Sequence, residues 1–104
     1  MRILLIDDTR NLEASIIARN YQEGLIQLTE NGPWDLLLLD HDLASFDENG
    51  KEKTGYDIMC FLEEKQEYLP KDISCVSANP VGKKRIEDVI RKLYPSRANS
   101  STNV

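Results

Sequence analysis

The sequence predicts an α/β fold built around an open parallel sheet. Two runs dominated by apolar residues, 2–6 and 35–40, lead into aspartates, as is typical of strands that are covered on both faces. Elsewhere, apolar residues recur at the i, i+3, i+4 spacing of amphipathic helices. The chain has 104 residues, enough for one domain with a single core. We expect that domain over residues 1–94 and a disordered tail over residues 95–104, which has almost nothing to bury.

The first half of the chain predicts two strands and one helix. Residues 2–6 form the first strand, and a polar link of residues 9–14 leads to a second strand at residues 15–18. That link is shorter than the dozen or so residues that a parallel crossover usually needs, so we expect at most one or two helical turns there. Asn20 stands three residues before a glutamate, a spacing that favours the start of a helix over about residues 21–31.

The second half predicts two more strands and two more helices. Residues 35–40 form the most apolar strand, followed by a polar loop at residues 44–53 that has the length of a mobile lid. The helical spacing then covers about residues 55–67. Residues 73–77 form the fourth strand, and the turn at residues 79–82 leads into the last helix.

These elements predict a specific topology. Parallel strands joined by right-handed crossovers give the strand order 2-1-3-4. Helices packed on both faces of such a sheet would form a three-layer α/β/α arrangement.

Composition and charge exclude several classes of protein. The formal net charge is −5 and the isoelectric point about 4.8, which argues against non-specific nucleic-acid binding or attachment to an anionic membrane. No apolar run approaches the ~20 residues of a membrane span. The first strand begins at Arg2, which leaves no room for a signal peptide, so we expect a cytoplasmic protein. Cys60 and Cys75 lie in apolar segments, and we expect both to be buried, reduced thiols.

Two acidic clusters directly follow two of the predicted strands. Asp7 and Asp8 follow the first strand, and Asp40, His41 and Asp42 close the third. The carboxyl ends of parallel strands meet at one edge of the sheet, so these carboxylates should converge there. Carboxylate oxygens suit Mg²⁺ or Mn²⁺. Asp8 and Asp40 are the best candidate ligands, with Asp7 as a third ligand or as their support. The alternative is a set of solvated turn residues.

Other residues near this edge could move a proton or hold a phosphate. His41, the only histidine, could act as a general acid, and Asp42 could share that task. Three basic residues occupy the first turn of the last helix, where the positive end of the helix dipole also attracts anions. The alternatives are a solvated basic face and residues that only cap the helix. The candidate phosphate contacts are Arg10, Ser77, Asn79, Gly82 and Lys83.

The pattern resembles the receiver domains of response regulators, which are flavodoxin-like. Those domains also begin with a strand that ends in an acidic pair, matched by Asp7-Asp8, and their phospho-acceptor aspartate falls on Asp40. Their fourth strand ends in Ser or Thr and a small residue, matched by Ser77-Ala78. The resemblance implies a shortened member, because the fifth strand with its lysine and the fifth helix are absent. Lys83 lies in the wrong element to replace that lysine.

A closer resemblance is to the cyclic-phosphate processing receiver-like family, which is frequent in phages and bacteria. The similarity lies in residues 7–10 (Asp-Asp-Thr-Arg), 39–43 (Leu-Asp-His-Asp-Leu) and 77–82 (Ser-Ala-Asn-Pro-Val-Gly). Members usually carry a histidine just before that serine, where this chain has Val76. The resemblance implies a small phosphorylated ligand such as a cyclic nucleotide.

Three functions follow as hypotheses. The first is a metal-dependent protein that binds a cyclic phosphate and hydrolyses it as a phosphoesterase. The second is a stand-alone receiver that is phosphorylated on Asp40. The third is a module that binds a nucleotide or a protein without turnover, a hypothesis that Val76 favours. The sequence does not determine the oligomeric state.

Overall fold

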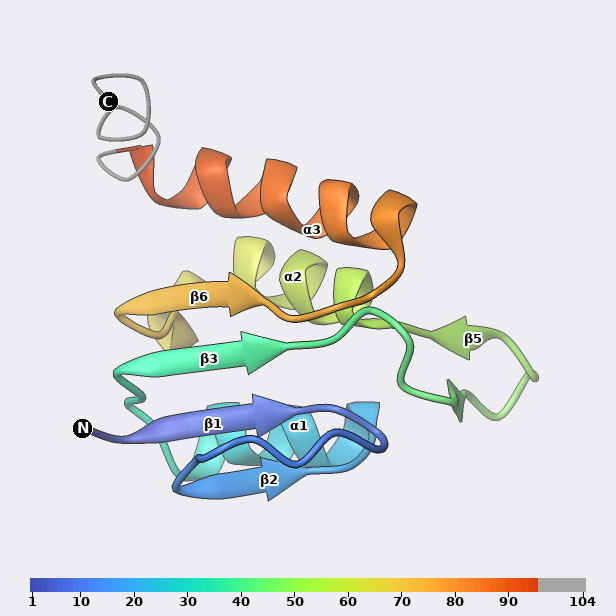
Figure 1. Ribbon diagram of the computed structural model, residues 1–104, viewed down its shortest axis with the longest axis horizontal. Helices are drawn as coiled ribbons and strands as arrows, with labels where there is room; N and C mark the ends of the chain where they lie inside the picture. The colour runs from blue at the N-terminus through green and yellow to red at the C-terminus, as the bar shows by residue number, and fades with distance from the viewer. Residues whose placement is uncertain (96–104) are drawn as a thin grey trace.

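Four parallel strands form the sheet in the predicted order. The computed structural model of the protein describes residues 1–95, so the predicted tail, apart from Pro95, lies outside the described residues. The sheet runs β2-β1-β3-β6, and every neighbouring pair is parallel (Figure 1). The strands are β1 (Ile3–Ile6), β2 (Ile16–Ala18), β3 (Leu36–Leu39) and β6 (Asp72–Cys75). The predicted α/β fold and strand order are therefore confirmed.

Three helices complete the fold. They are α1 (Tyr21–Glu30), α2 (Gly55–Glu64) and α3 (Pro80–Leu93), and the short 3₁₀ helix η1 (Gln66–Tyr68) follows α2. The second helix was predicted to continue to residue 67, but its backbone tightens to η1 after Lys65. No helix in residues 1–95 is long and apolar enough to cross a membrane.

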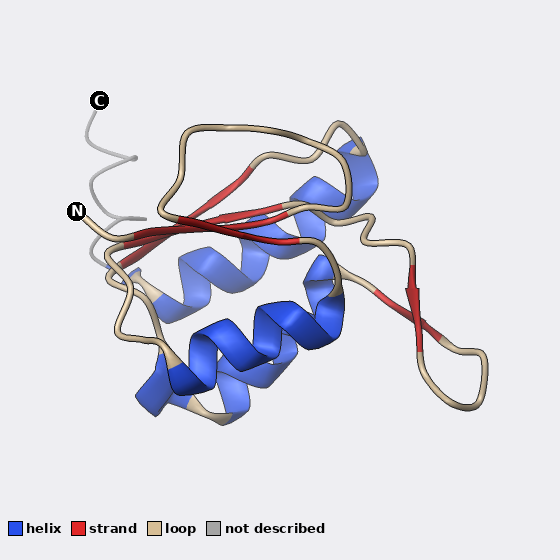
Figure 2. Ribbon diagram, turned by 90° about the horizontal axis from the view of Figure 1, so that it is seen from below, coloured by secondary structure: helices blue, strands red, loops and turns tan. Residues whose placement is uncertain are grey.

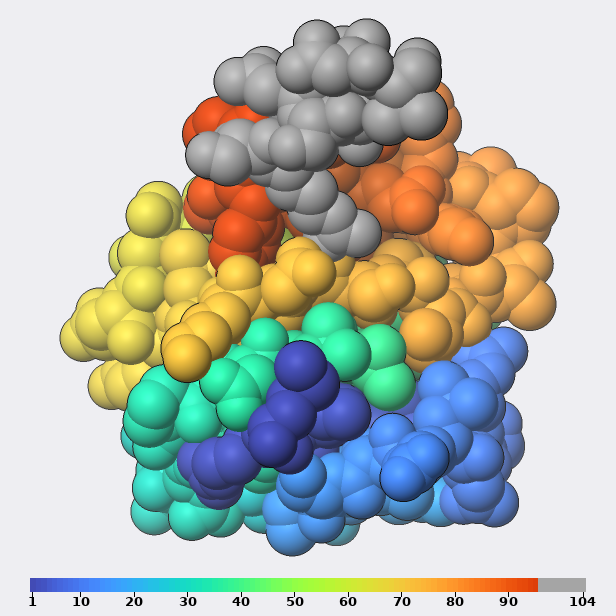
Figure 3. All heavy atoms as spheres, turned by 60° about the vertical axis from the view of Figure 1, so that its left-hand side comes forward, coloured from blue at the N-terminus to red at the C-terminus, as the bar shows by residue number. Residues whose placement is uncertain are grey.

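The helices share one hydrophobic core with one face of the sheet. Leu4 and Leu37 point into this core, which also contains Leu28 of α1, Ile58 of α2 and Ile86 of α3. Figure 2 shows α1 and α2 on one side of the sheet, while a long loop crosses the other side. In Figure 3, the orange and red atoms of α3 lie above the gold segment of β6, and the green atoms of β3 lie below it.

The predicted arrangement had helices on both faces of the sheet. The structure has helices on one face and a loop across the other. The short link after β1 contains no helix at all in residues 7–15, so nothing helical covers the second face within residues 1–95. The reason is the length of the link, which must return to the start of β2 after only nine residues.

The predicted loop at residues 44–53 contains a small hairpin. Strands β4 (Ser45–Phe46) and β5 (Glu52–Lys53) pair antiparallel, and the hairpin projects beyond the carboxyl ends of the sheet (Figure 1). The Asp47 carboxylate holds its turn, because Oδ1 accepts the backbone N–H groups of Asn49 and Lys51. Each strand has two residues, too few for alternation to be recognised in the sequence.

Only one of the two cysteines is buried as predicted. Cys75 is buried at the end of β6, and burial raises the pKa of its thiol. Cys60 is exposed, so the prediction for it is wrong. The inward face of α2 is formed by Ile58, Met59 and Leu62, and Cys60 lies on the other side of that helix.

The start of α2 packs against the chain just beyond β3. Thr54 and Asp57 form a capping box, in which the Thr54 N–H donates to Asp57 Oδ2 at 2.8 Å. Next to this cap, the Gly55 N–H donates to the carbonyl oxygen of His41 at 2.8 Å. A Cβ atom on Gly55 would lie only 2.0 Å from the carbonyl oxygen of Asp40. Residue 55 therefore has room for no side chain.

We expect Gly55→Ala to destabilise the protein by about 1–3 kcal/mol, because the new methyl group collides with backbone that cannot move without displacing β3 or α2. For a domain of this size, the melting temperature should fall by about 4–8 °C for each kcal/mol. Thermal unfolding followed by circular dichroism measures the change. Glu64→Ala, at the exposed end of the same helix, is the control and should stay within about 0.5 kcal/mol of the parent. A Gly55→Ala protein as stable as the control would contradict this packing argument.

Candidate functional site

The carboxyl ends of β1, β3 and β6 meet at one edge, as predicted. Ile6 pairs with Leu39 and Leu39 with Cys75, so the residues after these strands lie at the same level. The backbone continues the pairing, since the Asp40 N–H donates to the Ile6 carbonyl at 3.0 Å. Asp7 and Asp40 consequently lie side by side beyond the sheet.

Three carboxylates converge at this edge. One oxygen each from Asp7, Asp8 and Asp40 lies within 4.8 Å of the others. Two ligand oxygens on opposite sides of Mg²⁺ lie about 4.2 Å apart, twice the bond length of ~2.1 Å. Adjacent ligands lie about 3.0 Å apart, so the three carboxylates suit Mg²⁺ in chemistry and would draw closer together to share one ion. The predicted convergence is present, while the metal itself stays a prediction.

Asp7 is the most rigid of the three. Its side chain is buried, and Oδ1 accepts the backbone N–H groups of Thr9 at 3.0 Å and Arg10 at 2.8 Å. Oδ2 accepts Nη1 of Arg10 at 2.9 Å. Both oxygens thus already have partners, so Asp7 is better placed to support the site than to be its main ligand.

Arg10 partly neutralises the cluster. The Nη1 atom that bonds Asp7 lies 3.9 Å from Oδ1 of Asp40. Sequence reasoning proposed Arg10 as a phosphate contact, and the structure instead places its guanidinium between two carboxylates. A divalent cation at this cluster would have to share these oxygens with Arg10 or displace it.

Asp40 is the carboxylate with most to gain from a cation. Burial raises its pKa, and the neighbouring charge of Asp7 raises it further. The His41 backbone N–H, the Ser77 hydroxyl and Arg10 oppose that shift without cancelling it. The ionised form is therefore disfavoured here, and a bound cation would offset that cost.

His41 lies beside the start of α3. Because β3 ends at Leu39, strand alternation no longer fixes the direction of its side chain. The ring is mostly buried, and Nδ1 lies 2.9 Å from Oδ1 of the exposed Asp42. A Cβ atom on Gly82 would lie 2.3 Å from Cγ of His41. The predicted role of Gly82 was to admit a phosphate, and in the structure its missing side chain makes room for this ring.

Ser77 and Asn79 connect Asp40 to the start of α3. Asn79 is the N-cap, and its Oδ1 accepts the Gly82 N–H at 3.1 Å. Ser77 Oγ accepts the Asn79 N–H at 3.0 Å, and its hydroxyl bonds Asp40. Of the two roles left open for these residues, capping is present, and phosphate binding stays a prediction.

Lys83 is the basic residue best placed for an anion at this edge. It is half-buried in the first turn of α3 and has no ion-pair partner within residues 1–95. Burial raises the pKa of the Cys75 thiol at the end of β6, and the nearby charge of Lys83 opposes part of that rise. Lys84, by contrast, points away and pairs with Asp88.

Sequence reasoning missed one contributor to the site, Gly55, and gave another, Arg19, a different role as a possible phosphate contact. Gly55 holds the Asp40–His41 peptide through its backbone, as described above. Arg19 fastens the loop after β1, because its Nη1 donates to the carbonyl oxygens of Arg10 at 2.8 Å and Asp7 at 3.3 Å. Arg19 lies directly after β2 at the same edge, and a phosphate contact from it stays a prediction.

Comparison with known proteins agrees with this geometry. No curated protein and no solved structure matches the chain. The family described as the cyclic-phosphate processing receiver domain matches residues 2–92, which is nearly all of the described chain. Its span includes every candidate site residue named above, so the chain belongs to the cyclic-phosphate processing receiver family.

Proposed function

We propose that the protein binds a small cyclic phosphate, such as a cyclic nucleotide, together with Mg²⁺ or Mn²⁺ and hydrolyses it. The observation that carries the proposal is the meeting of the three carboxylates with the basic start of α3 at one sheet edge. Membership in the family supports the class of ligand. The acidic overall charge agrees with a small ligand held at a local site rather than a nucleic acid held by a basic surface.

The residues divide into three tasks. Asp8 and Asp40 would hold the metal, with Asp7 and its hydrogen bonds keeping the cluster in place. Such an ion supplies charge stabilisation at a phosphoryl oxygen. Lys83 and the first N–H groups of α3 would hold the remaining phosphate oxygens. The predicted phosphate contacts Arg10, Ser77 and Asn79 would reach the ligand only after leaving their present partners.

His41 would move the proton. Water adds to phosphorus while the bond to one ester oxygen of the ring breaks, which opens the ring to a phosphomonoester. His41 donates a proton to the leaving ester oxygen, and the proton released by the water restores the histidine. Asp42, bound to Nδ1, orients the ring so that Nε2 is left for this transfer.

Val76 favours a second candidate function, ligand binding without turnover. Val76 stands where family members usually carry a histidine, and a valine can neither donate nor accept a proton. Its backbone keeps β6 paired with β3, because the Val76 N–H donates to the Leu39 carbonyl at 3.0 Å. The fold of the site therefore does not need the histidine, while a reaction with two histidines would.

A stand-alone receiver that accepts a phosphoryl group on Asp40 has less support. The parallel sheet of residues 1–95 has four strands, and Lys83 lies on α3 rather than at the end of a fifth strand.

We expect the protein with Mg²⁺ or Mn²⁺ to open at least one member of a panel of cyclic phosphates. The panel contains 2′,3′- and 3′,5′-cyclic nucleotides, cyclic dinucleotides and ADP-ribose cyclic phosphate, and ³¹P NMR follows the phosphomonoester signal. Asp40→Asn should reduce the rate by at least about 100-fold, because it removes a carboxylate from the sheet edge where the metal and the phosphate would bind. Glu64→Gln, on the outer end of α2, is the control and should keep full activity. Saturable binding of a panel member without product would favour the second candidate function.

Metal binding has its own test, independent of turnover. Mg²⁺ at ten times its dissociation constant should stabilise the protein by about 1.4 kcal/mol, or several degrees in melting temperature. Without metal, Asp40→Asn should melt at a higher temperature than the parent, because a buried negative charge beside Asp7 is gone. The same variant should lose most of the Mg²⁺-dependent increase. An equal increase in parent and variant would argue against a metal at this cluster.

The packing of His41 on Gly82 predicts a separation of binding from chemistry. We expect Gly82→Ala to displace the imidazole ring and lower kcat by about 10–100-fold, while the Mg²⁺-dependent increase in melting temperature stays within a degree of the parent. Val81→Ala, one residue earlier and exposed, is the matched control. A Gly82→Ala enzyme with unchanged kcat would exclude a role for the present position of His41.

A further inference from the structure

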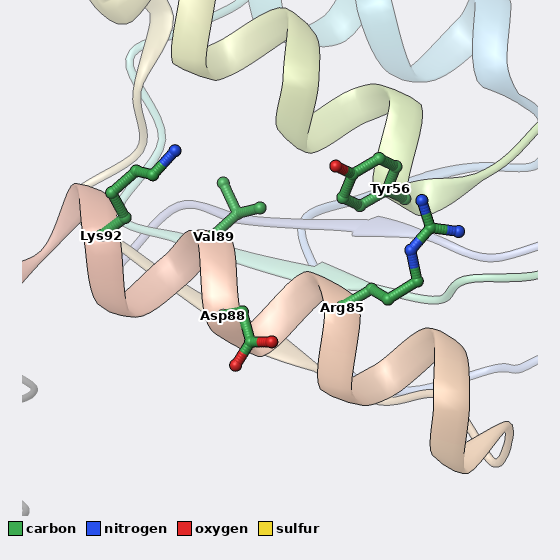
Figure 4. Close-up of a pocket in the computed structure, with 5 residues that line it drawn as sticks. All are labelled: Tyr56, Arg85, Asp88, Val89 and Lys92. Carbon is green, nitrogen blue, oxygen red and sulfur yellow. The ribbon is translucent and has the colours of Figure 1, made fainter.

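A pocket lies between α2 and α3, apart from the acidic edge, which is the sheet edge that carries Asp7, Asp8 and Asp40. It is lined by Tyr56 of α2 and by Arg85, Asp88, Val89 and Lys92 of α3, and it has a volume of about 200 Å³ (Figure 4). Arg85 is one of the three basic residues near the start of α3, and none of the other lining residues belongs to the site described above. The pocket is therefore a separate feature that the proposed function does not use.

Arg85 is the distinctive group in this pocket. Its guanidinium carbon lies 4.0 Å from the centre of the Tyr56 ring. Within residues 1–95 it forms no ion pair, although Lys84 and Arg91 on the same helix both pair with Asp88. A guanidinium stacked on an aromatic ring keeps its in-plane N–H donors free for a carboxylate or phosphate. The stacking also holds the side chain in one orientation before any ligand binds.

Two other polar groups lie around Arg85, the Tyr56 hydroxyl and the Lys92 ammonium group. The Tyr56 hydroxyl forms no hydrogen bond among the described residues, and in Figure 4 it is on the side of the ring toward Val89 and Lys92. Lys92 lies two helical turns from Arg85, about 10 Å along the axis, and its ammonium group bonds Glu63 at 2.6 Å.

The single acidic residue of the lining does not oppose an anion directly. In Figure 4 the carboxylate of Asp88 points away from α2 and from Tyr56. It is already bound by Lys84 at 3.3 Å and by Arg91. Because Lys92 is paired with Glu63, Arg85 is the lining charge without an ion pair among the described residues.

We propose that this pocket binds a small oxyanion, a carboxylate or phosphate group that accepts hydrogen bonds from the Arg85 guanidinium and the Tyr56 hydroxyl. Val89 forms the apolar part of the lining, which suits the short carbon chain of a small organic acid. The volume is below the roughly 300–1,000 Å³ of pockets that hold drug-sized ligands. A single anionic group or a short dicarboxylate fits, and a nucleotide does not.

The test is a titration of the whole protein with inorganic phosphate and with succinate, followed by ¹H–¹⁵N NMR. Ionic strength is kept constant with NaCl, since general screening also shifts signals. We expect saturable shifts at the Arg85 Nε–H and at the backbone amides of Tyr56 and Val89. A peptide with one glutamate, acetyl-Gly-Glu-Gly-amide, distinguishes a protein side chain from a free anion as the source. Tighter binding of either source supports the pocket and names its ligand.

Matched variants decide whether Arg85 is responsible. Arg85→Gln should weaken binding at least tenfold, and Tyr56→Phe should weaken it several-fold while keeping the stacked ring. Lys65→Gln removes an equal charge from the exposed end of α2, outside the pocket, and should leave binding unchanged. Shifts confined to residues 77–83, and retained in Arg85→Gln, would place the anion at the acidic edge and overturn this proposal without touching the proposed function. An absence of saturable shifts at residues 56, 85 and 89 would also overturn it.

Discussion

The close approach of α2 to the end of β3 fixes the geometry of the whole acidic edge. Gly55 brings its backbone against the Asp40 carbonyl and donates to the next carbonyl, that of His41. This contact turns the chain out of the sheet directly after Asp40, so that Asp40 stays beside Asp7 while His41 swings toward α3. Gly82 then admits the ring at the other side. Gly55 and Gly82, which lack side chains, thus fix the positions of Asp40 and His41, the two residues with central roles in the proposed reaction.

The electrostatics of the edge show a balance between stability and ligand binding. Three carboxylates in so small a space repel one another, and Arg10 relieves part of that repulsion from within the chain. Asp7 is satisfied by backbone donors, whereas Asp40 keeps a raised pKa. The cluster therefore retains a free-energy cost that an external cation can remove, which is common at functional sites.

The central strands of the sheet could be predicted because an apolar run that leads into aspartate is a local pattern. It can be recognised without knowledge of tertiary contacts. The sequence predicted the start of α1 equally well, since Asn20 caps that helix through Glu23, three residues later. It did not predict the β4–β5 hairpin, whose strands are too short to show a period, or the exposure of Cys60, which depends on which face of α2 meets the core. The packing of His41 on Gly82 joins residues 41 positions apart, and no local pattern encodes such a contact.

Helix α3 has 14 residues and is about 21 Å long, so it behaves as a rigid rod. Its first turn touches His41, its middle carries Arg85 and Val89, and its last turn carries Lys92. If α3 rotated or slid so that Arg85 moved relative to Tyr56, Gly82 would also move relative to the His41 ring. A ligand that bound one setting of this rod more tightly would alter binding at the other end by the same free energy, whichever site were filled first.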